Sequence, residues 1–126
     1  MRLALLAAFG GAAGSVARYL AVSAATKAFG ADFPWGTFGV NVLGSFAIGA
    51  IMAAIALHFG GSSELRVLLV TGFLGGFTTF SAFSYELMQL IERKAYLPAL
   101  AYAGGSVAVS LLAVSLGFAM IKAVSA

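Results

Sequence analysis

Long apolar stretches separated by a few charged residues dominate the chain. Between the charges lie four candidate spans: Leu3 to Thr26, a segment within Phe33–Ser63, a segment from about Arg66 that is uncharged from Val67 to Tyr85, and a segment within Ala95–Ile121. Each is long enough for the roughly 20 residues that a helix needs to cross the bilayer core. The pattern predicts an all-α membrane protein with four transmembrane helices, in a single domain over residues 1–126.

Composition excludes water as the main solvent. Hydrophobic residues make up 62% and charged residues 9% of 126 residues, whereas soluble domains carry about 25% charged residues. A chain this short has too little interior to bury so much apolar side chain. Without cysteine and with one histidine, the chain offers no nucleophile–base pair, so we expect neither an enzyme nor an organic cofactor. Its seven Lys and Arg residues are scattered, which argues against nucleic-acid binding.

The ends of the spans carry recognisable signals. Asp32 and Pro34 are typical of a cap and a first turn for the second helix. The run Gly60–Ser63 predicts a turn before the third helix. Glu92 to Lys94 form a short polar turn, and Pro98 fits the first turn of the fourth helix. The spans therefore follow one another through short loops.

The positive charges of the loops are balanced between the two membrane faces. Four spans place Arg2, Arg66 and Lys122 on one side, and Lys27, Arg93 and Lys94 on the other. Lys/Arg asymmetry normally sets the orientation of a membrane protein, and here there is none. Two interpretations stay open: a small count without meaning, or dual topology, in which oppositely inserted copies pair as an antiparallel homodimer.

The middle of the third span is a poor helix. Two adjacent glycines, Gly75 and Gly76, precede the two threonines Thr78 and Thr79, and this composition disfavours a helix interior. Since the span covers about 66–91, we expect a break near the bilayer midplane. A break at that depth must be buried in protein or line a cavity, where freed carbonyls can coordinate a cation. Close helix packing without an ion is the alternative.

Aromatic and polar side chains follow this predicted break. Phe80 and Phe83 are three residues apart and share a helix face, which Glu86 continues. Ser81 and Ser84 lie on the neighbouring face. A phenyl ring has a positive edge, so two ring edges can stabilise an anion without a formal charge. Ordinary packing of the two rings is the competing interpretation.

Further polar positions lie within the second and fourth spans. The second contains Thr37 and Asn41, and the fourth contains Tyr102, Ser106 and Ser110 at i, i+4 and i+8. That spacing makes one continuous stripe of hydroxyl donors along a helix. Such groups in a membrane either bond across helices or face a pathway.

Arg18 is the one charge far inside the first span, about 15 residues from its start, or roughly 22 Å along a helix axis. A charge at mid-membrane is costly, so Arg18 must reach the headgroups, pair structurally, or face a wet vestibule that attracts anions. Nearby Gly10, Gly11 and Gly14 form a small-residue face that fits helix packing or a dimer interface. The same N-terminal run has features of a signal peptide, but the glycines favour a retained helix.

Three stretches resemble the Fluc (CrcB) family of fluoride channels. They are the run Gly75–Glu86 (GGFTTFSAFSYE), the run Gly36–Phe46 (GTFGVNVLGSF) and the stretch Gly10–Arg18. The resemblance implies an antiparallel, dual-topology homodimer in the bacterial cytoplasmic (inner) membrane. It also implies two separate pathways per dimer, through which fluoride leaves the cell passively.

The resemblance implies roles for individual residues. Phe80 and Phe83 resemble the pair whose ring edges face fluoride, and Asn41 and Ser81 resemble the donors beside it. Gly75 and Thr78 resemble the pair whose backbone carbonyls bind a central structural sodium ion. The resemblance also covers the polar track of Tyr102, Ser106 and Ser110, the arginine Arg18, and Glu86 as a carboxylate that shapes the pathway. Thr37 completes the candidate pathway residues.

A different class of function remains as an alternative. Small multidrug-type exporters also have four helices and exchange protons for cations through a membrane carboxylate. The first span contains Arg18 and no acidic residue, so only Glu86, near the end of the third span, could serve. A non-conducting subunit of a larger membrane complex is a third possibility.

Overall fold

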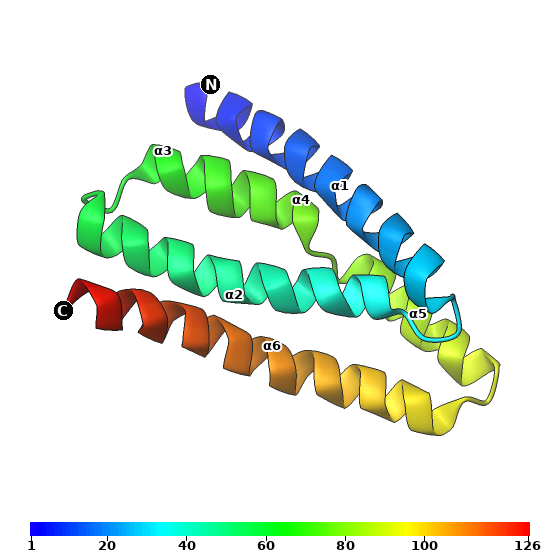
Figure 1. Ribbon diagram of the computed structural model, residues 1–126. Helices are drawn as coiled ribbons and strands as arrows, with labels where there is room; N and C mark the ends of the chain where they lie inside the picture. The colour runs from blue at the N-terminus through cyan, green and yellow to red at the C-terminus, as the bar shows by residue number, and fades with distance from the viewer.

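The computed structural model describes residues 1–126 and consists of helices joined by short connections (Figure 1). In chain order they are α1 (Arg2–Phe29), α2 (Trp35–His58), α3 (Ser63–Leu65), η1 (Arg66–Leu74), α4 (Gly75–Phe77), α5 (Ser81–Glu92) and α6 (Tyr96–Ser125). By length and composition, α1, α2, the run Ser63–Glu92 and α6 can each cross a membrane. The prediction of four transmembrane helices is confirmed.

The third span is interrupted where the sequence predicted a break. Its first half is the π-helix η1 followed by the single turn α4. Thr78 then leaves the helical conformation, with φ −92° and ψ 161°, and α5 begins at Ser81. Figure 1 shows α5 continuing the span only after this displaced, non-helical connection. The π-helical winding of Arg66–Leu74 was not predicted.

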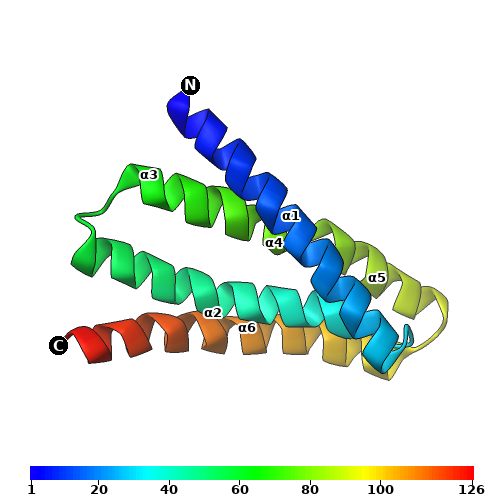
Figure 2. The ribbon, with the colours of Figure 1, turned by 45° about the horizontal axis from the view of Figure 1, so that its top comes forward.

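Glycines allow the close helix contacts within the protomer. In Figure 2, α1 crosses over η1 and α4, while α2 and α6 run side by side in the same direction. Gly10 and Gly14 are buried in the crossing, and a methyl group on Gly14 would meet the Phe73 carbonyl. A methyl group on Gly49 of α2 would likewise meet the Val114 carbonyl of α6. Gly10 and Gly14 therefore serve helix packing within the chain.

The interior is small and the apolar surface is large. Only 18 of 126 residues are buried, and large hydrophobic side chains such as Leu20, Leu97 and Leu112 are mostly exposed. One core cluster joins Val40, Leu74 and Phe77 beside the break, and another joins Leu90, Ala99 and Tyr102. A surface this apolar fits lipid as the solvent, as the composition predicted.

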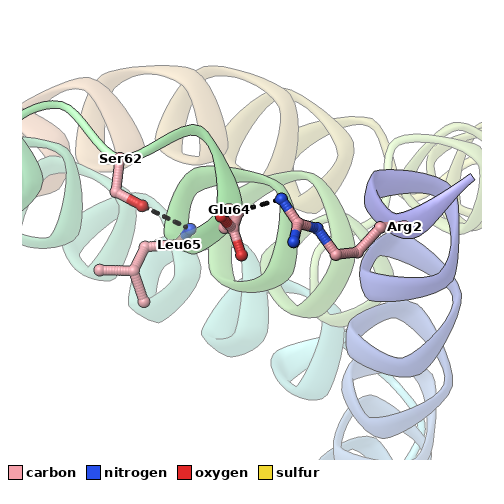
Figure 3. Close-up of polar contacts among 4 residues, drawn as sticks. All are labelled: Arg2, Ser62, Glu64 and Leu65. Carbon is pink, nitrogen blue, oxygen red and sulfur yellow. Dashed lines mark hydrogen bonds and ion pairs between the residues drawn. The ribbon is translucent and has the colours of Figure 1, made fainter.

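The connection between α2 and α3 follows its sequence signal. Gly60 and Gly61 adopt positive φ angles of 62° and 70°, which only glycine adopts freely. Ser62 then caps α3 by accepting a hydrogen bond from the Leu65 N–H at 3.2 Å. Figure 3 shows this cap beside an exposed ion pair, in which Arg2 reaches from α1 to Glu64 at 3.3 Å. The start of the third span is thus tied to the start of the first.

One end signal was interpreted wrongly. Asp32 does not cap α2: Pro34 precedes the helix at the capping position, and no side chain bonds the first turn. The carbonyl of Asp32 instead accepts a hydrogen bond from Arg93 at 2.8 Å, which links this loop to the one after α5. Pro34 fixes its own φ near the helical value, so the helix starts without a side-chain cap. The predicted turn at Glu92–Lys94 and the position of Pro98 in the first turn of α6 are confirmed.

Candidate functional site

An open groove of about 520 Å³ lies beside the interruption of the third span. Its walls come from α2, η1, the Thr78–Phe80 connection, α5 and α6. It brings together seven of the candidate residues: Asn41, Gly75, Thr78, Phe80, Phe83, Ser106 and Ser110. Residues that are far apart in sequence therefore meet around the break.

Asn41 holds the non-helical connection in place. Its Nδ2 donates to the Thr79 carbonyl at 2.9 Å, and its Oδ1 accepts from the Thr79 N–H at 2.8 Å. The side chain thus replaces the helical partners that Thr79 loses at the break. The second Nδ2 proton is not used by these bonds, so the amide still offers the groove a donor.

The carbonyls released by the break divide into two groups. Gly76 O accepts from Arg18 Nε at 3.0 Å, and Thr79 O is bound by Asn41. By contrast, the carbonyl oxygens of Gly75 and Thr78 accept no hydrogen bond, because Thr79 N–H is bound by Asn41 and Ala82 N–H by Thr79 Oγ1. No group of three or more His, Cys, Asp or Glu side chains is placed to hold a metal. Backbone oxygens are therefore the available ligands for a cation here.

Three aromatic rings form a row from the protomer surface to its interior. The Phe80 side chain is 78% exposed. Its ring centroid lies 5.6 Å from that of Phe83, and the Phe83 centroid lies 4.9 Å from that of Tyr102. Tyr102 is fully buried. Phe80 is thus a large apolar side chain at the rim of the groove without a packing partner on its outer side.

Glu86 accepts hydrogen bonds from two candidate residues on other helices. Thr37 Oγ1 of α2 donates to Oε2, and the Tyr102 hydroxyl of α6 donates to Oε1, both at 3.0 Å. Both donors are almost fully buried, at 2% and 0% exposed. The sequence predicted these as pathway residues but did not predict that they converge on the carboxylate. Their separations along the chain, 49 and 16 residues, carry no periodic signal.

The remaining hydroxyls differ in their surroundings. Ser106 Oγ is buried and has no hydrogen-bond partner, although the residue lines the groove. Ser110 lines the groove one turn further along α6. Ser81 lies outside the groove lining and is exposed, with Oγ 3.4 Å from Thr79 Oγ1. Thr79, which the sequence did not single out as a site residue, contacts both Asn41 and the start of α5.

A second open cavity of about 560 Å³ lies between α1, α2 and α5 and is lined by Glu86. Its lining includes Arg18, Lys27, Thr37 and Glu86, together with hydroxyl groups of α1. We call this cavity the vestibule. Structural pairing and a place in the vestibule are therefore compatible for Arg18, because Nε pairs with the Gly76 carbonyl while the side chain also lines the vestibule.

Four membrane-length spans, one of them interrupted, and neutral donors along a groove define a small multi-pass membrane protein. The family model described as "CrcB-like protein, Camphor Resistance (CrcB)" matches residues 5–118, and the chain belongs to this family.

Curated relatives are similar over nearly the full chain. One from Rhizobium johnstonii is 50% identical over 122 residues, covering 97% of this chain and 98% of the relative. One from Chelativorans sp. is 50% identical over 120 residues, covering 95% and 96%. One from Phenylobacterium zucineum is 46% identical over 128 residues and covers both chains fully. Each is named "Fluoride-specific ion channel FluC". The family is one of ion channels and not of enzymes, in agreement with the sequence.

Proposed function

We propose that this chain forms a passive, fluoride-selective channel that exports fluoride across the bacterial cytoplasmic membrane. The proposal rests on the similarity to curated relatives. They are about 50% identical over nearly the whole chain and are named fluoride-specific ion channels. Because these relatives are named as ion channels, they do not support the alternative of a multidrug-type exporter. The groove provides chemistry that suits the proposed ion.

Fluoride is small and holds its water tightly, so its hydration must be replaced along the pathway. The groove offers the Asn41 amide N–H, the Ser106 hydroxyl and the rings of Phe80 and Phe83. These are neutral donors and positive ring edges, which stabilise an anion without trapping it. The positive charge of Arg18 lies in the neighbouring vestibule, where it raises the local anion concentration.

The channel in this proposal is an antiparallel, dual-topology homodimer with two fluoride pathways. Support comes from the balanced Lys/Arg count, since neither orientation of the protomer is favoured. Further support comes from the groove, which is open on the protomer surface and has the 78% exposed ring of Phe80 at its rim. An oppositely oriented second copy would close the groove and cover that ring.

A structural sodium ion at the dimer centre completes the proposal. Hard cations prefer oxygen ligands, and the carbonyl oxygens of Gly75 and Thr78 have no hydrogen-bond partner. The residues therefore fit such an ion, and two copies would contribute these oxygens twice. Bound there, the ion compensates the negative ends of the carbonyl dipoles, while the protein holds the break through Asn41 and Arg18.

A fluoride-electrode efflux assay on proteoliposomes tests the proposal. Purified protein should release fluoride down its gradient with far less chloride, whereas protein-free vesicles should retain both. Phe80→Ile and Phe83→Ile should reduce the flux, and Phe9→Ile should not, because Phe9 is an exposed α1 residue outside the groove. Absence of fluoride flux above that of empty vesicles would refute the channel. Equal chloride flux would refute the selectivity, and unchanged flux in both groove variants would remove the aromatic role.

A further inference from the structure

Glu86 occupies two hydroxyl donors that an anion would need. Thr37 Oγ1 and the Tyr102 hydroxyl donate to the two carboxylate oxygens at 3.0 Å each. A hydroxyl has a single proton to donate. While these two bonds hold, neither Thr37 nor Tyr102 can donate to a passing ion. Their assignment to a fluoride pathway therefore requires that the carboxylate move away.

The carboxylate lies between a residue of the groove and the vestibule, because its partner Tyr102 packs against Phe83. On one side, Phe83 lines the groove and its ring packs against Tyr102, with centroids 4.9 Å apart. On the other side, Glu86 and Thr37 themselves line the vestibule. A pathway that joins the groove to the vestibule along these contacts passes Glu86.

We propose that the Glu86 carboxylate is a displaceable occupant of the pathway, which holds the Thr37 and Tyr102 hydroxyls until a fluoride ion takes them. The inference rests on the proposed fluoride conduction. Two negative groups at one pair of donors repel each other strongly in a site of low dielectric constant. The donors are thus held either by the carboxylate or by fluoride, and not by both.

The vestibule gives the displaced carboxylate a favourable destination. It is lined by Arg18 and Lys27, the cations that share this cavity with Glu86. Arg18 uses Nε for the Gly76 carbonyl, which leaves its four Nη protons to bind an anion. Before displacement, the two hydroxyls stabilise the carboxylate. After displacement, the hydroxyls stabilise fluoride, and Arg18 and Lys27 stabilise the carboxylate.

Burial explains why the donors need an occupant at all. Thr37 and Tyr102 are 2% and 0% exposed, so water does not reach their hydroxyls freely. An unpaired buried hydroxyl is unfavourable. The carboxylate satisfies both groups between ions, and fluoride replaces it only by making equivalent bonds.

The fluoride concentration that gives half-maximal flux through proteoliposomes tests this inference. If the donors are open about one-tenth of the time, competition raises the apparent dissociation constant about tenfold. Glu86→Ala should therefore lower the half-maximal concentration several-fold. Glu86→Gln should lower it less, because one amide oxygen still accepts a hydroxyl proton. The matched control is Glu92→Gln, an exposed carboxylate at the end of the same helix, which should leave it unchanged.

The opposite results overturn the inference. If Glu86 only holds α5 against α2 and α6, the fluoride concentration for half-maximal flux should be unchanged or higher in both Glu86 variants. A second measurement uses the unaltered protein and does not depend on variant folding: an infrared difference spectrum between fluoride and chloride. Displacement of Glu86 should shift a carboxylate stretching band, and its absence at saturating fluoride overturns the inference. Unaltered protein without fluoride flux refutes the channel itself, which separates the two failures.

Discussion

Replacement of Asn41 by leucine tests how the break in the third span is held. Leucine has nearly the same size but neither donates nor accepts hydrogen bonds. The substitution removes the bond to the Thr79 carbonyl at 2.9 Å and the bond from the Thr79 N–H at 2.8 Å. Thr79 lies outside both flanking helices, so no helical partner replaces Asn41.

The size of the effect follows from these two bonds. A buried backbone group left unpaired costs about 1–3 kcal/mol in a protein interior. Interhelical polar contacts measured in membrane proteins are smaller, at about 0.6–1.7 kcal/mol each. With the smaller values, the free energy of unfolding of Asn41→Leu should fall by about 1–3 kcal/mol.

Unfolding of the protein in mixed micelles with increasing SDS measures this loss. Asn41→Asp is the matched control, because the carboxylate still accepts from the Thr79 N–H but cannot donate to the Thr79 carbonyl. It should retain part of the lost stability and still abolish fluoride flux, since it replaces the groove's N–H donor by a negative charge. An Asn41→Leu protein as stable as the parent would refute the role of Asn41 at the break.

Two further predictions concern unpartnered groups. Ser106→Ala should not lower the unfolding free energy, because Ser106 Oγ has no partner and a buried unpaired hydroxyl is unfavourable. It should still reduce fluoride flux. Ser115→Ala, whose hydroxyl bonds its own helix backbone, is the matched control, and equal flux in both variants would contradict the role of Ser106. Exchange of sodium for potassium at constant ionic strength should lower the melting temperature, since a ligand at 100 times its dissociation constant stabilises by about 2.7 kcal/mol. Identical melting curves would contradict the sodium site.

Local sequence patterns predicted the spans and the break correctly. The length of an apolar run and the pair Gly75–Gly76 followed by Thr78–Thr79 are properties of short segments, and they act wherever the segment lies. The same holds for the turn at Gly60–Gly61, which depends on positive φ angles.

Contacts between distant segments could not be predicted in this way. Asn41 is 38 residues from Thr79, and Thr37 is 49 residues from Glu86; only the packing of α2 against the third span brings them together. The wrong prediction for Asp32 has a similar cause. Its carbonyl bonds Arg93 from another loop, so tertiary contact replaced a local preference for capping.

The two unpartnered carbonyl oxygens, of Gly75 and Thr78, have a consequence for biogenesis. In the proposed dimer with its central sodium ion, these oxygens gain their ligands only after a newly inserted chain meets a second copy. The stability of each copy would then rise with the number of sister molecules that the membrane already contains. Scarce expression would leave individual copies exposed to proteolysis, whereas abundant expression would protect them.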